Sequence, residues 1–357
     1  MHRREFLTGV VANGCVLREY ALVPDATPHV GRDQRRSTDG DAGGAPLEEA
    51  AGLVVFTYDD GPIEDYTMTY RIHREYGVPG CLAVCPGRME DSGGFLEPGH
   101  LREMHGDGWG VLSHTYRHRA LGRIGLAEPA REGDRRAYVE THRHGRFEGD
   151  PLVVFDDETT VSATVAGRGS DSTGEFVEFE APLSESIGAS GYVRYPERFM
   201  RDVLARTDAR LESWGVEVSG FVYPYDRYHG AIEGIVRERY GAVANHRYGG
   251  GHNGIDGLDP TTMRRRYVQT DKASEAEIAA FMETAATEDV LAIVGAHSQF
   301  ETFPEERLRY TIETALEYDL AIVTVGEAIA ALAGRDDEPA GSSQRPRGSV
   351  DTTFPLR

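Results

Sequence analysis

Lysine is almost missing from this sequence of 357 residues, in which Lys272 is the only one. Arginine therefore carries the positive charge, and 38 basic side chains stand against 59 acidic ones, for a formal net charge of −21. This balance argues against a nucleic-acid partner, because a phosphate backbone requires a basic face. The acidic excess predicts adaptation to high salt, where screening weakens self-repulsion. The alternative is an ordinary acidic protein from a GC-rich genome.

Cysteine is also scarce, with only Cys15, Cys81 and Cys85. An odd count without regular spacing argues against a disulfide framework. If the run CLAVC is a strand, the Cα atoms of Cys81 and Cys85 lie about 13 Å apart, which is too far for a disulfide. We expect both to be small core residues.

Long apolar runs are absent, so we expect no transmembrane helix. The N-terminus does carry Arg3-Arg4 before Glu5-Phe6-Leu7 and a short apolar stretch, which resembles a twin-arginine export signal. It predicts an exported protein, extracellular or at the cell surface; the alternative is a disordered arm with a chance arginine pair, in a cytoplasmic protein. We interpret residues 1–50 as this segment and a linker, and residues 335–357 as a disordered tail.

Between these ends, short apolar runs alternate with helical patterns of ten or more residues. Such alternation predicts βαβ units with parallel strands, and hence an α/β fold, over residues 51–334. The strands expected from the apolar runs are 53–58, 81–85, 109–113, 218–223, 241–245, 290–296 and 321–325.

One segment, at about residues 123–195, interrupts this pattern. It contains alternating runs such as TVSATVAG and GEFVEFEAP, separated by Gly, Asp and Ser, which predict a small antiparallel β insertion. His142 and His144 within it have no partner at metal-ligand spacing, so we expect them to be solvated loop residues. Phe155-Asp156-Asp157 is expected to form a hairpin turn. We assign no chemistry to the insertion.

Two polar motifs follow the first and third expected strands of the α/β domain. Thr57-Tyr58-Asp59-Asp60-Gly61-Pro62 places adjacent carboxylates at a strand end, where catalytic groups gather in βα folds. Two adjacent acids there are costly unless a cation or proton offsets them. His114 and His118 follow the third strand, and on a helical turn this spacing would aim both imidazoles at one divalent ion. Each motif alone is weak evidence, since an Asp-Gly-Pro turn or a surface HxxxH is common.

Together the motifs TYDDGP and HTYRH resemble those of the polysaccharide deacetylases, the family with a NodB-like homology domain (carbohydrate esterase family 4). Phe221 to Tyr225 (FVYPY) and Leu291 to His297 (LAIVGAH) resemble its third and last motifs. The resemblance covers about residues 53–122 and 197–332. It implies a distorted (β/α) barrel of seven or so parallel strands.

The resemblance also implies the roles of the site residues. Asp59 would be the general base and His297 the acid, while Tyr225, through its backbone N–H, and Pro224 would lie at the oxyanion and substrate. Asp60, His114 and His118 would hold a divalent metal, with zinc expected, and the substrate would be an N-acetylated glycan.

The chain departs from the family pattern in two places. Val222 stands where many members carry an Arg that restrains the base. The Asp and Trp that buttress the catalytic His are not evident, and Arg264-Arg265-Arg266-Tyr267 occupies that region; one of these arginines is a candidate to orient Asp59.

Two alternatives to a deacetylase remain open. One is a hydrolase of a small cyclic amide on the same fold, although members of that branch tend to lose the metal triad. The other is a glycan-binding module with little or no turnover. Tyr223, Tyr225 and Tyr228 could form a sugar-stacking wall or simply pack.

Overall fold

The computed structural model of the chain describes residues 50–91, 93–246 and 250–336. The predicted export segment, nearly all of the predicted linker and most of the predicted tail lie outside these residues, so they stay predictions. Among the described residues, no helix is both long enough and apolar enough to cross a membrane.

The larger of two sheets is built around β1 (Gly52–Asp60), which is buried over almost its whole length. The strand order is β10-β3-β2-β1-β13-β11, with β12 on β13 and β14 on β1, and every pairing is parallel except that of β11. The other strands are β2 (Cys81–Val84), β3 (Gly110–Ser113), β10 (Val218–Phe221), β11 (Asn253–Gly254), β12 (Arg266–Tyr267), β13 (Val290–Ala296) and β14 (Leu320–Val323). The predicted α/β class is confirmed, whereas closure into a barrel stays a prediction, because these pairings leave β10 and β11 at the two ends of the order.

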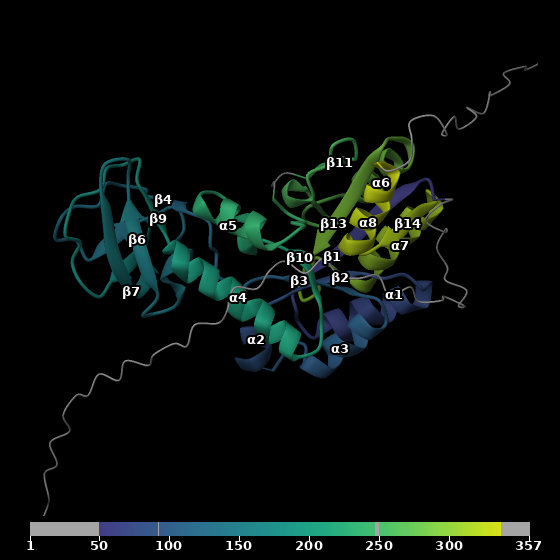
Figure 1. Cartoon of the computed structure of the whole chain (residues 1–357), viewed down its shortest axis with the longest axis horizontal. Coiled ribbons are helices and arrows are strands. Elements are labelled where there is room, and N and C mark those ends of the chain that lie inside the picture. The colour runs from purple at the N-terminus through teal and green to yellow at the C-terminus, as the bar shows by residue number, and fades with distance from the viewer. Residues whose placement is uncertain (1–49, 92, 247–249, 337–357) are drawn as a thin grey trace, which may run out of the picture. The chain divides into compact units, whose positions relative to one another are not determined.

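Two strands share the same side of β1, and this arrangement positions the site. The first half of β1 pairs with β14 and the second half, Thr57 to Asp60, pairs with β2. The carboxyl ends of β1, β2 and β3 therefore lie side by side, as Figure 1 shows. Residues that follow these strands meet at one edge of the sheet.

Helices cover this sheet and bury its apolar residues. Contacts link α6 to β1, β13 and α7, and link α7 to β14. The helix α6 begins at a capping box, in which Ser274 and Glu277 bond each other's backbone N–H. The helical elements around the sheet are η1 (Asp65–Tyr70), α1 (Arg71–Tyr76), α2 (Pro86–Asp91), α3 (Pro98–Gly106), α4 (Glu197–Ser213), η3 (Pro224–Asp226), α5 (Ala231–Arg239), η4 (Pro260–Thr262), α6 (Glu275–Thr287), α7 (Glu305–Glu317) and α8 (Val325–Asp336).

The strand predicted at 241–245 is wrong. In this segment only Val243 forms an isolated bridge, to Phe221. The reason is the side chain of Asn245, which accepts a hydrogen bond from the Tyr223 N–H and donates one to the Tyr223 carbonyl. The backbone of this segment thus pairs with Phe221, and an asparagine amide takes the place of backbone pairing at Tyr223.

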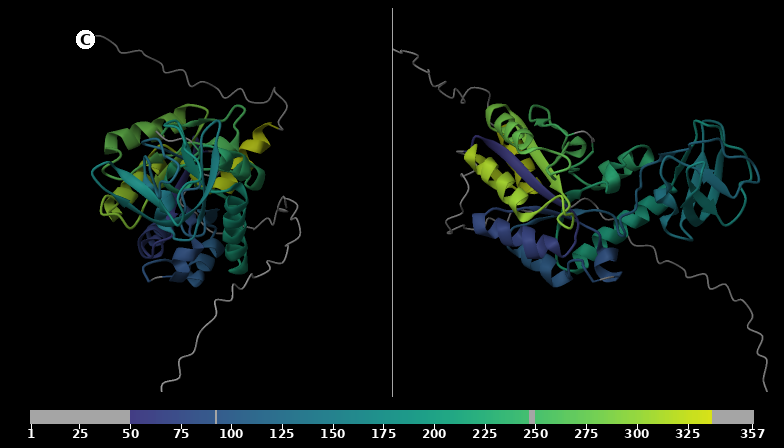
Figure 2. Two further views of the ribbon diagram at one scale, coloured as in Figure 1. Left: turned by 90° about the vertical axis from the view of Figure 1, so that its left-hand side faces the viewer. Right: turned by 180° about the vertical axis from the view of Figure 1, so that it is seen from behind.

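The second sheet lies between β3 and α4 in the chain and is antiparallel throughout, in the order β4-β9-β6-β7-β8-β5. It occupies the region interpreted from the sequence as an insertion, and Figure 2 shows it in teal. Asp156 caps the turn between two of its strands, since its Oδ1 accepts from the Glu158 and Thr159 N–H groups. Its elements are β4 (Ile124–Gly125), β5 (Arg136–Tyr138), η2 (His142–Arg146), β6 (Pro151–Phe155), β7 (Thr160–Ser170), β8 (Glu175–Phe179) and β9 (Tyr192–Arg194).

The antiparallel sheet shares one apolar cluster with α4, α5 and β10. Val154 and Val193 of the sheet belong to the same cluster as Leu204 of α4 and Ile232 of α5. The expectation that His144 is solvated is wrong: it is fully buried, and its Nε2 donates to the Ala120 carbonyl at 2.9 Å. His144 therefore links this sheet to the loop that follows β3.

Candidate metal and catalytic site

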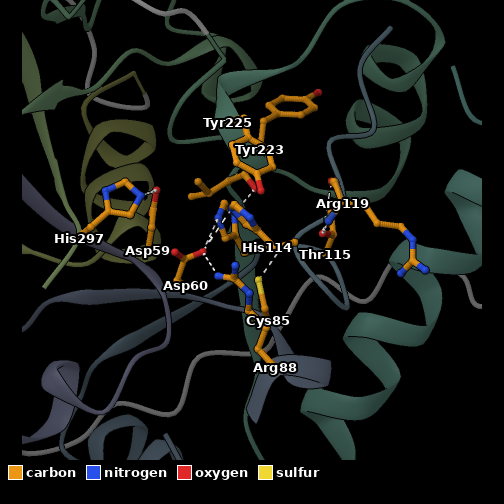
Figure 3. Close-up of polar contacts among 12 residues, drawn as sticks. Asp59, Asp60, Cys85, Arg88, His114, Thr115, Arg119, Tyr223, Tyr225 and His297 are labelled. Carbon is orange, nitrogen blue, oxygen red and sulfur yellow. Dashed lines mark hydrogen bonds and ion pairs between the residues drawn. The ribbon is translucent and has the colours of Figure 1, made fainter. Parts of the chain in front are cut away.

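Asp59 and Asp60 end β1, and both are buried. Neighbouring strand residues normally point to opposite faces, but the backbone turns sharply here, because Asp60 has φ 81° and Gly61 has φ 73°. A positive φ is costly for an aspartate. The turn brings both carboxylates to the same pocket, where Figure 3 shows them beside His114 and His297.

His114 and His118 follow β3 and reach the same pocket, with ring centroids 4.7 Å apart. The expected helical turn is wrong, because Thr115 and His118 have φ 60° and 58°. The imidazoles are instead brought together by a left-handed turn, in which the Thr115 hydroxyl accepts from the Arg119 N–H. The Nε2 atoms of His114 and His118 lie 3.8 and 3.3 Å from Oδ1 of Asp60.

The donor atoms of this cluster are of the types that a divalent ion binds. His114 Nδ1 donates to the Val222 carbonyl at 2.7 Å, which leaves the Nε2 lone pair facing Asp60. Among the described residues, His114 Nε2 is buried without a hydrogen-bond partner, and the buried Asp60 Oδ1 has no partner other than its ion pair with Arg88. Burial lowers the pKa of both histidines, so they are neutral, as ligands must be.

A second ligand set overlaps the first. Ligand atoms of Asp60, Cys85 and His114 lie within 4.8 Å of one another. However, the Cys85 thiol donates to the His114 carbonyl, and burial raises its pKa well above the usual range. We therefore favour His118 over Cys85 as the third ligand. Arg88 also contacts Asp60 Oδ1 as an ion pair at 2.6 Å, so an ion would compete with it.

Asp59 is held by Arg265, the middle residue of the arginine run. Arg265 Nη1 and Nη2 donate to the two carboxylate oxygens at 2.7 and 2.5 Å, and both residues are buried. Burial alone would raise the pKa of Asp59, but the charge and hydrogen bonds of Arg265 outweigh it and lower the pKa to about 2. Asp59 is therefore ionised. Arg265 restrains its carboxylate, a role expected of the third-motif arginine in whose place this chain has Val222.

His297 follows β13 and faces Asp59, with 3.9 Å between its Nε2 and Asp59 Oδ2. Its Nδ1 lies 3.3 Å from Oε1 of the buried Gln269. Its ring stacks on Phe300, with centroids 4.9 Å apart. Gln269 thus occupies the place of the missing buttress, although an amide carries no charge. No sequence pattern points to Gln269, because a lone glutamine has no recognisable signature.

Pro224 and Tyr225 lie on the opposite side of the histidine pair. Tyr225 and Asp226 have φ 60° and 51°, and Asn245 Nδ2 holds this turn by donating to Asp226 Oδ1 at 2.6 Å. The Tyr225 ring lies 4.3 Å from the His118 ring, whereas Tyr223 is buried in the apolar cluster and cannot form a sugar-stacking wall. The structure therefore brings together six of the residues expected at the site, which are Asp59, Asp60, His114, His118, Tyr225 and His297, and Pro224 directly precedes Tyr225 in the chain.

Residues 48–141 match the family model described as polysaccharide deacetylase. Over these residues the chain is similar to the polysaccharide deacetylase family. They include both acids and both histidines of the deacetylase motifs, which supports the family predicted from the sequence. Tyr225, Arg265 and His297 lie beyond the matched segment, and so does most of the antiparallel sheet.

Solved structures of carbohydrate deacetylases and esterases are similar to the chain at low identity. They include the Xyl-CE4 domain of a multidomain xylanase from the hindgut metagenome of Trinervitermes trinervoides (13% identity, 81% of this chain and 93% of that chain covered, TM-score 0.44). A chitin deacetylase from Colletotrichum lindemuthianum matches at 14% identity, with 78% and 87% covered and a TM-score of 0.43. A peptidoglycan deacetylase from Bacillus subtilis matches at 12%, with 80% and 93% covered and a TM-score of 0.44. No curated protein matches the sequence.

Proposed function

We propose that the protein is a metal-dependent hydrolase that removes N-acetyl groups from the sugars of a polysaccharide or surface glycan. The observation that carries this proposal is the buried cluster of Asp60, His114 and His118. Within the region that the structure describes, His114 Nε2 has no hydrogen-bond partner, and the Nε2 atoms of both histidines face Asp60 Oδ1, which is also in an ion pair with Arg88. An ionised carboxylate, Asp59, lies directly beside this cluster.

The residues divide the chemistry of amide hydrolysis among them. Asp60, His114 and His118 would hold a divalent ion, for which we propose zinc, and a bound ion would supply Lewis-acid chemistry that acidifies water and polarises a carbonyl. Asp59 accepts the proton of the attacking water, because Arg265 keeps its carboxylate ionised and fixed. His297 gives a proton to the departing nitrogen. The backbone N–H of Tyr225, beside Pro224, is the donor we assign to the oxyanion.

One exposed aromatic side chain supports a sugar substrate. Phe300 is 47% exposed, and it is the only large hydrophobic residue in the described part of the chain with such exposure. Its ring lies nearly parallel to that of His297, with an interplanar angle of 7°. An exposed ring face next to the proposed acid can pack on the C–H face of a sugar ring.

Acetate release tests the proposal. The purified protein, loaded with zinc, should release acetate from N-acetylglucosamine oligomers, and a chelator should abolish the release. Asp59→Asn should remove most activity while the zinc content stays at the wild-type level, because Asp59 is not assigned as a ligand. No acetate from any N-acetylated glycan would refute the proposal. Hydrolysis of a cyclic amide without metal would favour the cyclic-amide hydrolase. Glycan binding without turnover, unchanged in Asp59→Asn, would favour the glycan-binding module.

A further inference from the structure

Two arginines of the antiparallel sheet's η2 segment reach the site. The guanidinium carbon of Arg143 lies 3.5 Å from the centroid of the Tyr225 ring. Nη1 of Arg146 donates to the Tyr225 hydroxyl at 3.3 Å. Tyr225 in turn lies against the His118 ring, with an interplanar angle of 56°, so contacts run from the Arg143 guanidinium through the phenol ring to a histidine of the metal cluster.

Neither arginine has a carboxylate partner among the described residues. No ion pair involves Arg143 or Arg146, and Nε of Arg143 is buried without a hydrogen-bond partner. The carboxylate of Glu175 acts weakly on Arg143, but it is occupied by His142, whose Nδ1 lies 2.9 Å away. Such unpaired cations are unexpected in a chain with 59 acidic residues against 38 basic ones.

The two arginines are not needed to attach the antiparallel sheet to the rest of the fold. Arg119, in the loop after His118, already makes a bidentate ion pair with Asp150 at 2.7 and 3.0 Å, and both side chains are largely buried. His144 bonds the Ala120 carbonyl, and the apolar cluster continues into α4 and α5. Arg143 and Arg146 are therefore free to serve a ligand.

The distances place their charge next to the reacting sugar. The Arg143 guanidinium carbon lies 3.5 Å from the Tyr225 ring centroid, which lies 4.3 Å from the His118 ring centroid. The guanidinium carbon is therefore within about 8 Å of the His118 ring. Arg146 and Arg88 both act electrostatically on His118. A guanidinium fork binds carboxylate, sulfate or phosphate oxygens in pairs.

We propose that Arg143 and Arg146 bind a negatively charged group of the glycan, so that the preferred ligand is an acidic acetylated polysaccharide. The inference rests on the proposed function for its substrate class, and it assigns to the antiparallel sheet a part in substrate selection. A carboxylate on the sugar next to the N-acetylated one is the simplest such group. The phenol of Tyr225, under the guanidinium, keeps Arg143 in place for it.

Binding measurements test this without requiring turnover. The zinc-loaded full chain is titrated calorimetrically with an oligosaccharide that alternates N-acetylglucosamine and glucuronic acid, and with an N-acetylglucosamine oligomer of equal length. Wild type should bind the acidic oligosaccharide more tightly. Arg143→Gln/Arg146→Gln should weaken acidic binding at least about tenfold, because charged hydrogen bonds are lost, and neutral binding less than about threefold. Acetate release from both oligosaccharides is measured in parallel. If the wild type releases acetate from neither, the proposed function fails, and this outcome is distinct from a failure of the charge preference.

Two controls separate recognition from folding and from net charge. Arg131→Gln/Arg168→Gln removes the same charge from two exposed positions, one in the connection between β4 and β5 and one in β7, and it should leave the ratio of the two affinities unchanged. Arg146→Lys keeps the charge and should retain part of the preference. Equal affinities of wild type for the two oligosaccharides, or an unchanged ratio in the Arg143→Gln/Arg146→Gln protein with an intact thermal transition, would overturn the inference. A sulfated oligosaccharide that outcompetes the carboxylated one would reassign the charged group to sulfate, and that would overturn the choice of carboxylate.

Discussion

Arg265 and Asp59 are separated by 206 residues in the chain, yet each is almost fully buried and they meet through two hydrogen bonds. Removing one partner of such a pair leaves an uncompensated charge in the interior. Arg265→Gln should therefore lower the free energy of unfolding by about 3–5 kcal/mol, measured by urea denaturation. Arg266→Gln is the matched control, since the Arg266–Glu277 pair is more exposed and should contribute under about 1 kcal/mol. Equal losses in the two variants would contradict this account of the pair.

Gln269 gives His297 a neutral partner where a charged one is usual in the family. Gln269→Ala should lower kcat while leaving KM near the wild-type value, because the imidazole loses the partner that orients it. Gln269→Glu keeps an oxygen at His297 Nδ1 and should retain more of the activity than Gln269→Ala. Steady-state kinetics of the three proteins give the comparison. A Gln269→Ala protein with the wild-type kcat would show that Gln269 does not position the acid.

His118 and Cys85 compete for the role of third metal ligand, and metal content distinguishes them. His118→Ala should lower the zinc bound after dialysis to well below one per chain, because only two ligands then remain on the favoured set. Cys85→Ala should leave the zinc content near the wild-type value, because its thiol is occupied with the His114 carbonyl. Zinc is measured by mass spectrometry of the metal. The reverse pattern would show that Asp60, Cys85 and His114 form the site.

The segment η2 depends on a histidine that is buried without charge. Burial lowers the pKa of His144 to about 4, although its hydrogen bonds to backbone carbonyls oppose the shift. The folded state thus binds this proton less readily than the unfolded state, whose pKa is about 6.5. The stability from His144 is complete above pH 6.5 and is lost as the pH falls towards 4.

His144→Gln should consequently flatten the dependence of stability on pH. Between pH 7 and pH 4.5, the wild type should lose about 2–3 kcal/mol of unfolding free energy through His144, and the variant should not lose that part. His73, whose pKa burial also lowers to about 4, remains in both proteins and sets a common background. Urea midpoints at the two pH values give the comparison. An identical loss in the variant would rule out His144 as the titrating group.

At the level of elements, the sequence predicts strands that follow from a run of apolar residues. It does not predict a segment whose structure depends on hydrogen bonds between a side chain and the backbone. The strand Val290–Ala296 was predicted with its observed bounds, because a buried parallel strand is one continuous apolar run. The segment 241–245 has a similar run, but Asn245 bonds Tyr223 across the fold, and no local pattern shows that. For the same reason, Arg265 was only one candidate among three neighbours, and Gln269 was not found.

For the whole molecule, the net charge of −21 has a measurable consequence. Screening lengths fall from about 10 Å at 0.1 M salt to about 3 Å at 1 M, so repulsion between acidic side chains should weaken. We expect the thermal midpoint to rise between 0.1 M and 2 M NaCl, and to rise equally in KCl, because screening depends on ionic strength. Differential scanning calorimetry measures the midpoint. A midpoint that stays constant or falls would contradict salt adaptation and favour the ordinary acidic protein.

The apolar cluster shared by the antiparallel sheet, α4 and α5 also determines how this protein can be re-engineered. Excising residues 123–195 would strip the buried face from α4, which precedes the strand and loop leading to Val222 and Tyr225, and from α5, which follows them. Such a shortened chain would be prone to aggregation, and its inactivity would say nothing about selectivity. A transplant of this recognition element into another deacetylase has to carry α4 and α5 with it, as a single graft from residue 123 to Arg239.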